Sequence, residues 1–342
     1  MDWTKLSFAV QKTDSLIISR FTDGEWSEPE VSKDFTFHMD VYAGVFHYSN
    51  SCFEGLKAFR GADGKIRIFR PDENAARLAR SGAFLGMPYP SPELFIKMCR
   101  MCVEANIDYL PPYGYNASMY LRPVLIGTNP QLNVTSSKEA VFAVLGNPVG
   151  SYSGIKGLTS VTATIARNYD RAAPNGTGSY KLGANYAPSF HAYNLAHSQG
   201  FTELLFLDPA TKTNIDEFGT SNFLAIKGNT YVTPLSDSVL PSITNKSLRQ
   251  IAADMGMKVE QRVVPAAELS EFDEVNACGT AVVITPIYSI TDKPALESES
   301  ATKVYEFGRP GEVGAVSKKL YDHLRGIQDG IEQDVHDWCM IL

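Results

Sequence analysis

One lysine lies in an unusual glycine-rich setting. Lys181 falls within the segment 174–189, PNGTGSYKLGANYAPS, where its neighbours are small, aromatic or apolar instead of charged. An arbitrary lysine is a solvated surface charge, but an amine that loses solvation among such neighbours becomes a usable nucleophile. The segment lacks the GxxxxGK[ST] pattern, so a Walker phosphate loop is not supported. The chemistry that most needs such an amine is Schiff-base formation with a carbonyl cofactor.

A carboxylate in the segment EFGTSNFL is the second candidate. Glu217 follows residues 208–216, DPATKTNID, which have turn character. The default interpretation is that an acid at such a place solvates the turn. The functional interpretation pairs Glu217 with the ring nitrogen of a pyridine cofactor. A carboxylate there keeps the nitrogen protonated, so the ring accepts the electrons of a substrate carbanion.

Three further motifs supply groups that hold a phosphate. Ile243 and Thr244 are expected at the N-terminus of a helix, where backbone N–H groups attract anions. Thr280 is expected on a turn inside an apolar stretch and adds a hydroxyl. Arg77 and Arg80 share a predicted helix, and we expect one to reach the anion and the other to be a surface charge. With the amine and the acid, these groups meet the protein-side requirements for pyridoxal phosphate.

A set of segments, in order over nearly the whole chain, resembles a branched-chain amino-acid aminotransferase, a fold-type IV pyridoxal-phosphate enzyme of the class IV aminotransferases. The segments are FEGLKAFR (53–60), NAARLARSG (74–82), YLRPVLIG (120–127), RAAPNGTGSYKLGANYAPS (171–189), EFGTSNF (217–223), LPSIT (240–244) and CGTA (278–281). Two positions depart from the usual pattern. Leu224 stands where an aromatic residue is usual, and Asn245 stands where an arginine is often seen. Neither change removes an expected cofactor ligand.

The resemblance implies a role for each motif residue. Lys181 is the Schiff-base lysine and proton carrier, Glu217 binds the pyridine nitrogen, and Tyr186 hydrogen-bonds the ring hydroxyl. The residues implied to bind the cofactor are Arg77, Lys181, Tyr186, Glu217, Ile243, Thr244 and Thr280. Those implied to bind the substrate are Phe53, Tyr120, Arg122, Tyr152, Thr280 and Ala281, with Tyr48, Leu132 and Val134 donated by the other subunit of a homodimer.

The activity implied by the resemblance is transamination of leucine, isoleucine and valine with 2-oxoglutarate, by a ping-pong mechanism that gives branched-chain 2-oxo acids and glutamate. The pocket residues are apolar or aromatic, which suits an aliphatic side chain. The nearest alternatives are a D-amino-acid transaminase and an aminodeoxychorismate lyase, which share the fold type. The presence of both Lys181 and Glu217 argues against a non-catalytic cofactor carrier. A nucleotide-binding domain is disfavoured because no GxGxxG follows a strand.

Composition limits the cellular compartments and the binding partners that are compatible with this chain. The 342 residues include 31 Lys+Arg and 38 Asp+Glu, and the net charge of −7 argues against a nucleic-acid partner. No apolar run reaches the ~18 to 20 residues that span a membrane, and the start has no signal-peptide pattern. The five cysteines are few and odd in number, which favours a reducing cytoplasm. Cys99 and Cys102 lie on one apolar helical stripe, so we expect buried thiols and no metal site.

The element pattern predicts an α/β (α+β) protein of two domains. Helices are expected from Pro71, over 91–109, over 242–256 and over 315–333, with a hairpin over 56–69 and strands over 140–146, 160–166, 202–208, 223–228 and 258–264. A smaller N-terminal α/β domain is predicted at 1–147, a linker at 148–158, and a larger C-terminal cofactor-binding domain at 159–342. The resemblance adds a barrel-like sheet in the larger domain and places the cofactor between the two.

Overall fold

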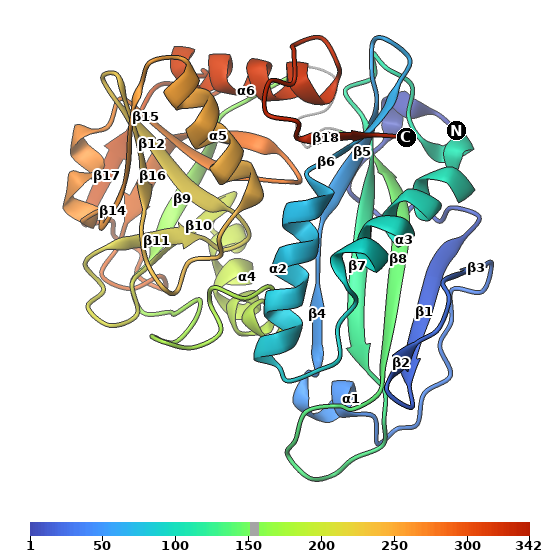
Figure 1. The fold of residues 1–342 in the computed structure, drawn as a ribbon. Coiled ribbons are helices and arrows are strands. Elements are labelled where there is room, and N and C mark those ends of the chain that lie inside the picture. Colours follow the sequence, from blue (N-terminus) through green and yellow to red (C-terminus); the bar gives the residue numbers. More distant parts are fainter. Residues whose placement is uncertain (151–156) are drawn as a thin grey trace. The chain divides into compact units, whose positions relative to one another are not determined.

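The chain folds into two compact units (Figure 1). The computed structural model describes residues 1–150 and 157–342. Within these, the first unit comprises 1–150, 180–183 and 326–342, and the second comprises 157–179 and 184–325. The short segment with Lys181 therefore belongs to the first unit. The predicted domain boundaries stay predictions, and residues 151–156 of the predicted linker, with Tyr152, lie outside the described residues.

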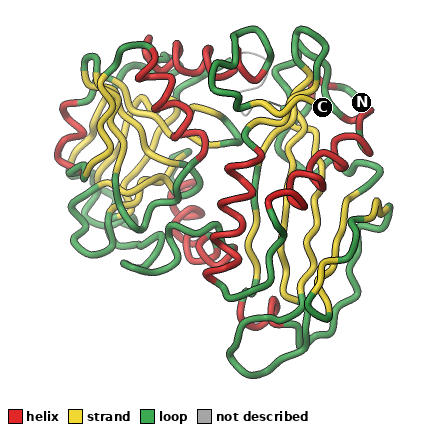
Figure 2. Tube along the Cα trace, in the orientation of Figure 1, coloured by secondary structure: helices red, strands yellow, loops and turns green. Residues whose placement is uncertain are grey.

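A nine-stranded antiparallel sheet forms the frame of the first unit (Figures 1 and 2). Its strands are β1 (Leu16–Thr22), β2 (Glu25–Trp26), β3 (Glu30–Ser32), β4 (Ser51–Phe53), β5 (Leu56–Arg60), β6 (Ile66–Phe69), β7 (Ser118–Gly127), β8 (Ala140–Val149) and β18 (Cys339–Ile341). They follow the order β18-β6-β5-β7-β8-β1-β2, with β3 on β1 and β4 on β7. The predicted hairpin is confirmed as β5 and β6. Strand β8 is longer than predicted because it pairs with β7 as far as Val149.

Two helices of the first unit, α2 (Pro71–Phe84) and α3 (Pro92–Ala105), begin where the sequence predicts. Each has proline in its first turn, and the Ser91 hydroxyl accepts the N–H of Leu94 at the start of α3. Cys99 and Cys102 are fully buried in the core between α3 and the sheet, which confirms the predicted core thiols. The described part of this unit also contains the short helices η1 (Trp3–Lys5), α1 (Gly44–Tyr48) and η2 (Ile107–Tyr109).

Six strands of the second unit close into a barrel. They are β9 (Val161–Ala166), β10 (Glu203–Leu207), β11 (Ile215–Phe218), β12 (Asn222–Lys227), β15 (Glu274–Gly279) and β16 (Val283–Asp292). The order β11-β10-β9-β16-β15-β12 is closed by the pairing of Glu217 with Asn222. Their apolar side chains form one buried cluster. Outside the ring lie β13 (Thr230–Pro234), β14 (Lys258–Arg262) and β17 (Lys303–Glu306). The predicted α/β class and barrel-like sheet are confirmed.

The helices of the second unit follow the predicted starts. Helix α5 (Ile243–Asp254) is capped by Ser242, whose hydroxyl accepts the N–H of Asn245. Helix α6 (Ala315–Gln328) ends before the predicted residue 333, because Gly330 turns the chain at a φ of 69°. Among the described residues, no helix has the length and apolar character needed to cross a membrane. The shorter helices are η4 (Gly183–Asn185), η5 (Ala187–Ser189), α4 (Phe190–Ser198) and η6 (Ala266–Glu271).

Candidate active site

Lys181 is held within the first unit through its backbone. Its N–H donates to Oγ of Ser81 on α2 at 3.1 Å, and its carbonyl accepts the N–H of Phe53 at 3.2 Å. The ammonium Nζ lies 4.9 Å from the centroid of the Phe53 ring. The next residue, Leu182, is buried and forms a β-bridge with Cys52. The amine is therefore half-buried beside an aromatic ring, as its sequence neighbours predict.

Tyr120 and Arg122 lie beside the same ring. The Arg122 guanidinium is 4.7 Å from the Phe53 centroid, and its Nη2 donates to the Tyr120 hydroxyl at 3.1 Å. A Cβ at Gly55 would lie 2.0 Å from that hydroxyl, so a larger residue would displace Tyr120. The first unit thus brings Lys181 and three predicted substrate-binding residues together. A guanidinium and a hydroxyl side by side suit a carboxylate.

Arg77 is buried on α2 and paired with an acid that sequence reasoning missed. Its Nε donates to Oε1 of Glu54 and its Nη2 to Oε2, each at 2.7 Å. The Arg77 side chain is 9% exposed and that of Glu54 is 0% exposed, so the pair is dry and bidentate. The available signal was an acid between Phe53 and Gly55, at the start of FEGLKAFR. Arg80 is exposed, and its guanidinium lies 5.2 Å from the centroid of the Tyr180 ring.

Glu217 is buried on β11 and is not solvated on a turn, so the turn interpretation is wrong. Its Oε2 accepts Nδ2 of Asn222 at 2.7 Å, and its Oε1 accepts the N–H of Leu240 at 3.0 Å. Burial raises the pKa of the Glu217 carboxyl, while the nearby Arg171 charge and the two hydrogen bonds oppose that rise. The result is a buried carboxylate with a fixed orientation.

Arg171 is the second residue that sequence reasoning missed. Its Nη2 lies 2.8 Å from Oε1 of Glu217, and the two side chains are 9% and 4% exposed. The same Nη2 donates to the carbonyls of Gly178, at 2.9 Å, and Ser238. The guanidinium is therefore anchored by backbone as well as by charge. Its sequence signal was a cation at the head of the glycine-rich run RAAPNGTG.

The first turn of α5 is tied to the barrel through Asn222. Nδ2 of Asn222 donates to the Leu240 carbonyl at 3.0 Å, and its Oδ1 accepts Nδ2 of Asn245 at 3.2 Å. Asn222 also lies opposite Cys278 in the pairing of β12 with β15. Ile243 and Thr244 open α5. Thr280 lies on a turn, as predicted, and this turn covers 280–282, directly after β15. These links hold the helix N-terminus on the barrel strand that pairs with β15.

Asn245, the departure from the usual arginine, has a structural role. It is 6% exposed, its Nδ2 also donates to Oγ1 of Thr233 at 2.8 Å, and its Oδ1 accepts the hydroxyl of Tyr231 at 3.1 Å. Together with its bond to Asn222, these contacts occupy both ends of the amide. An arginine at position 245 would be longer and could only donate hydrogen bonds, so it would not fit the same buried network.

The remaining predicted residues lie in two places. Tyr186 precedes η5, where its carbonyl accepts the Ser189 hydroxyl at 2.7 Å. Tyr48 donates to the carbonyl of Leu132. The side chains of Leu132 and Val134 are largely exposed, at 64% and 85%. These two apolar side chains contribute nothing to the core of their own unit.

The donor set fits pyridoxal phosphate. The first unit offers the Lys181 amine and the Arg77 guanidinium. The second offers a buried carboxylate, Glu217, with the N-terminus of α5 and the hydroxyls of Thr244 and Thr280. The cofactor aldehyde needs an amine, and its pyridine nitrogen needs a carboxylate. Its phosphate needs N–H groups, hydroxyls and a guanidinium.

Comparison with known proteins identifies the family. The chain belongs to the class IV aminotransferases, whose model, "Amino-transferase class IV", matches residues 51–290. It is 42% identical to a branched-chain-amino-acid aminotransferase of Haemophilus influenzae, over 99% of this chain and 98% of that one. The enzyme of the same name from Helicobacter pylori is also 42% identical, over 99% and 97%. The solved branched-chain amino acid aminotransferase of Escherichia coli superposes with a TM-score of 0.75 at 25% identity, covering 96% and 99%.

These relatives define the activity as well as the fold. The chain is a fold-type IV, pyridoxal-phosphate-dependent enzyme that transaminates branched-chain amino acids. The sequence predictions of family, reaction and cofactor are therefore confirmed. The roles of individual site residues stay predictions.

Proposed function

We propose that the chain transfers the amino group of leucine, isoleucine or valine to 2-oxoglutarate in a ping-pong cycle, with Lys181 as Schiff-base lysine. The observation that carries the proposal is the position of Lys181 Nζ, 4.9 Å from the Phe53 ring centroid, with Arg122 4.7 Å from the same centroid. Pyridoxal phosphate, when bound, supplies an aldehyde and an electron sink for the Cα electrons of the substrate. The side chains of the enzyme bind, orient and move protons.

Lys181 is the proton carrier in this proposal. With cofactor and substrate bound, the free amine Nζ of Lys181 would take the proton from the substrate Cα. The hydrogen bonds that Lys181 donates to Ser81 and accepts from Phe53 fix its backbone, so its amine moves only through side-chain rotations. This restricted motion keeps the Lys181 amine within reach of the substrate Cα proton.

Glu217 holds the pyridine nitrogen in its protonated form, and Arg171 keeps Glu217 ionised. Tyr186 donates to the ring hydroxyl. The phosphate is held by the Arg77 guanidinium, by the N–H groups at the start of α5 and by hydroxyl groups. The phosphate ligands in this proposal are Arg77, Ile243, Thr244 and Thr280.

The substrate carboxylate is bound by Tyr120 and Arg122, with the backbone of Thr280 and Ala281. Apolar walls then select an aliphatic side chain. Phe53 lines these walls in the proposal, and the family resemblance assigns Tyr152, which lies outside the described residues, to the same pocket. The second copy in a homodimer contributes Tyr48, Leu132 and Val134.

Exposed apolar side chains on the first unit support the homodimer. Val41, Phe46, Leu132 and Val134 are 71%, 59%, 64% and 85% exposed, in and near α1 and in the segment before β8. Such a group of apolar residues marks a protein interface. A cytoplasmic location is supported by the five cysteines, which are all unpaired.

An amino-donor panel against 2-oxoglutarate tests the proposal. Leucine, isoleucine and valine should be good donors, and alanine should be poorer by about 1 to 3 kcal/mol in kcat/KM, the range that an apolar pocket discriminates. Aspartate should be nearly inert, because its short carboxylate would lie unpaired among apolar walls. Equal rates for aspartate and leucine, or a preference for D-leucine, would contradict the proposed substrate.

Borohydride reduction tests the role of Lys181. The wild-type enzyme should be yellow, should bleach on reduction and should carry the label on Lys181. Lys181→Ala should lose transamination and still bind cofactor through phosphate and ring contacts. A label on another lysine would show that the residue assignment is wrong while leaving the reaction class intact.

A further inference from the structure

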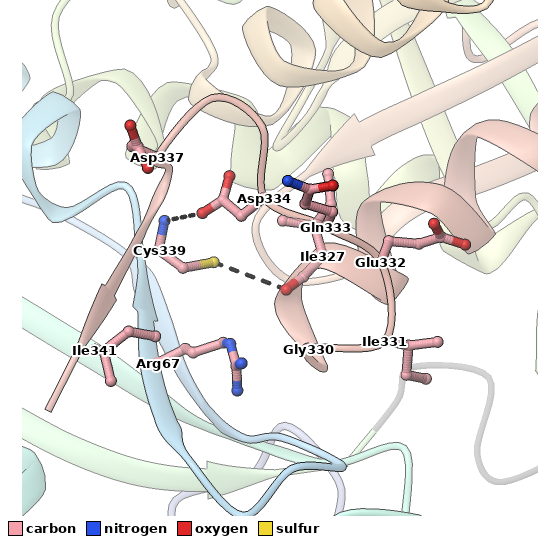
Figure 3. A pocket seen from close by; sticks show the side chains of 10 residues that line it. All are labelled: Arg67, Ile327, Gly330, Ile331, Glu332, Gln333, Asp334, Asp337, Cys339 and Ile341. Carbon is pink, nitrogen blue, oxygen red and sulfur yellow. Dashed lines mark hydrogen bonds between the residues drawn. The ribbon is translucent and has the colours of Figure 1, made fainter.

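The last ten residues, 333–342, form a strap along the edge of the sheet of the first unit, and we call this segment the C-terminal strap. Its strand β18 pairs with β6, so that Cys339 lies opposite Phe69. Asp334 shapes the preceding turn, because its Oδ1 accepts the N–H of Trp338 at 3.0 Å and its Oδ2 that of Cys339 at 2.7 Å. A cavity of about 450 Å³ lies beside this turn. Figure 3 shows Arg67, Asp334 and Cys339 among the side chains that line it.

Trp338, in the C-terminal strap, contacts the junction between β6 and α2. Its carbonyl accepts the N–H of Arg70 at 2.7 Å. Its ring lies 4.9 Å from the Arg70 guanidinium and meets the Phe69 ring edge-on, with centroids 6.0 Å apart. The Trp338 side chain is 9% exposed, so the contact is nearly dry.

Arg70 has a backbone conformation that needs such support. Its φ of 48° and ψ of 49° are left-handed, which is unfavourable for a residue with a Cβ. Residues keep such conformations when the surrounding structure holds them there. The Arg70 carbonyl also accepts Nδ2 of Asn74 at 3.0 Å, so the same residue fixes the first turn of α2. Loss of Trp338 would let the junction relax and change the direction of α2.

The direction of α2 matters because this helix carries two site contacts. Arg77 lies about two turns beyond Arg70, and Ser81 about one turn further. Arg77 makes both of its 2.7 Å bonds to Glu54, and the Ser81 hydroxyl accepts the N–H of Lys181. A rotation or tilt at the junction would therefore move the phosphate guanidinium and the support of the Schiff-base lysine together.

We propose that Trp338 is a positioning residue for the cofactor site, acting through Arg70 and α2 on Arg77 and Lys181. This inference rests on the proposed role of Arg77 as a phosphate ligand. No residue of the C-terminal strap need touch cofactor or substrate for the effect. The strap sets the geometry in which the phosphate is bound.

The test measures the dissociation constant of pyridoxal phosphate from the apoenzyme by titration of the visible absorbance. Trp338→Ala should weaken binding at least about tenfold, because small displacements of a binding group have large effects. Trp338→Phe keeps an aromatic ring and should stay within about threefold. Ile341→Ala is the matched control, because Ile341 lies in the same strand opposite Arg67 and is 49% exposed. It should bind as wild type does. Wild-type affinity in folded Trp338→Ala would overturn the proposal.

Two further variants separate this inference from the proposed function. Arg77→Gln should weaken pyridoxal phosphate far more than it weakens pyridoxal, which has no phosphate. Adding Trp338→Ala to Arg77→Gln should then cost less than Trp338→Ala costs in the wild-type enzyme, because the part of its effect that acts through Arg77 is already lost. If Arg77→Gln leaves pyridoxal phosphate affinity unchanged, the phosphate assignment fails. If it weakens affinity and the two changes add fully, the positioning role of Trp338 fails.

Arg70→Gln keeps the test decisive if Trp338→Ala does not fold. It removes the guanidinium over the Trp338 ring and its ion pair with Glu73 at 3.1 Å, and it leaves the backbone bond between Arg70 and Trp338. We expect pyridoxal phosphate to bind at least about threefold more weakly, with a shifted pH dependence of the visible absorption band. Unchanged affinity and an unchanged band in this variant would contradict the proposal.

Discussion

The Arg171 guanidinium lies 2.8 Å from Oε1 of Glu217, and both side chains are almost completely buried. Burial alone favours the protonated form of Glu217, since a carboxylate in a low-dielectric site loses its hydration. The positive charge of Arg171 opposes that effect and favours the ionised form. The pair therefore sets the charge of the group that faces the pyridine nitrogen in the proposed mechanism.

We predict that Arg171→Met moves the acid limb of the kcat profile to higher pH by at least about one unit. Without the cation, burial raises the pKa of Glu217 further, and more of the carboxyl is protonated at a given pH. Activity should therefore be lost earlier as the pH falls. The measurement is kcat for leucine across the pH range with saturating cofactor.

Arg171→Lys is the matched control for that prediction. It keeps the charge beside Glu217 and should keep the acid limb near its wild-type position, although it loses donors to the backbone carbonyls. Glu217→Gln marks the other extreme, with about 3 kcal/mol or more added to the barrier at every pH, because the amide does not ionise. An acid limb that stays in place in folded Arg171→Met would show that Arg171 does not control Glu217.

Glu54→Gln should destabilise the apoenzyme more than the holoenzyme. The change leaves the buried Arg77 charge without its bidentate partner, at a cost of about 3 to 5 kcal/mol in the free energy of unfolding. A bound phosphate would return a counter-charge to Arg77 and recover part of that loss. Urea denaturation with and without pyridoxal phosphate measures both values. Equal destabilisation in the two forms would argue against Arg77 as a phosphate ligand.

The exposed pair on α3 is the control for that experiment. Arg100 and Glu104 are 2.7 Å apart, with side chains 58% and 50% exposed. Glu104→Gln should change the free energy of unfolding by less than about 1 kcal/mol, with or without cofactor, because solvent screens surface pairs.

The sequence identified Lys181 and Glu217 because unusual residue types stand in unusual neighbourhoods. It did not identify Glu54 or Arg171, because each acts through an ion pair with a residue that is distant in the sequence. Only the paired strands and α2 bring Glu54 to Arg77. Likewise, helix starts were predictable from the local caps Ser91 and Ser242, whereas closure of the barrel depends on non-local pairing.

Glu203→Gln should stabilise the protein at pH 8 and leave stability nearly unchanged at pH 4. Burial raises the pKa of Glu203 on β10 from 4.5 to about 7, and among the described residues its Oε2 has no hydrogen-bond partner. Because the pKa of Glu203 is higher in the folded than in the unfolded protein, its protonated carboxyl contributes stability that is fully present below about pH 4.5. This contribution is lost as the pH rises through about 7. The glutamine should therefore gain up to about 3 kcal/mol at pH 8. Urea denaturation at both pH values measures this.

Glu260 on β14 provides a control of opposite sign. Its hydrogen bond with Arg262 and its contact with Lys258 lower the pKa of the Glu260 carboxyl to about 2. Its stabilising contribution is present above the unfolded pKa and is lost as pH falls through about 2. Glu260→Gln should therefore lower stability at pH 8, not raise it. A gain at pH 8 in both variants would point to a general loss of negative charge instead of relief at Glu203.

The cysteines should provide no reversible redox switch. Burial raises the pKa of Cys52 and of Cys102 to about 12, and it also raises the pKa of Cys278, which directly precedes Gly279. Peroxide attacks thiolates, which are scarce at such pKa values. Cys99 and Cys102 lie three residues apart on one regular helix, an awkward geometry for a disulfide.

Mild peroxide near pH 7.5 should therefore leave transamination intact. The same treatment in urea should oxidise the thiols, which would show that burial protects them. Inactivation of the folded enzyme that a dithiol reverses, with a mapped intramolecular disulfide, would contradict this prediction.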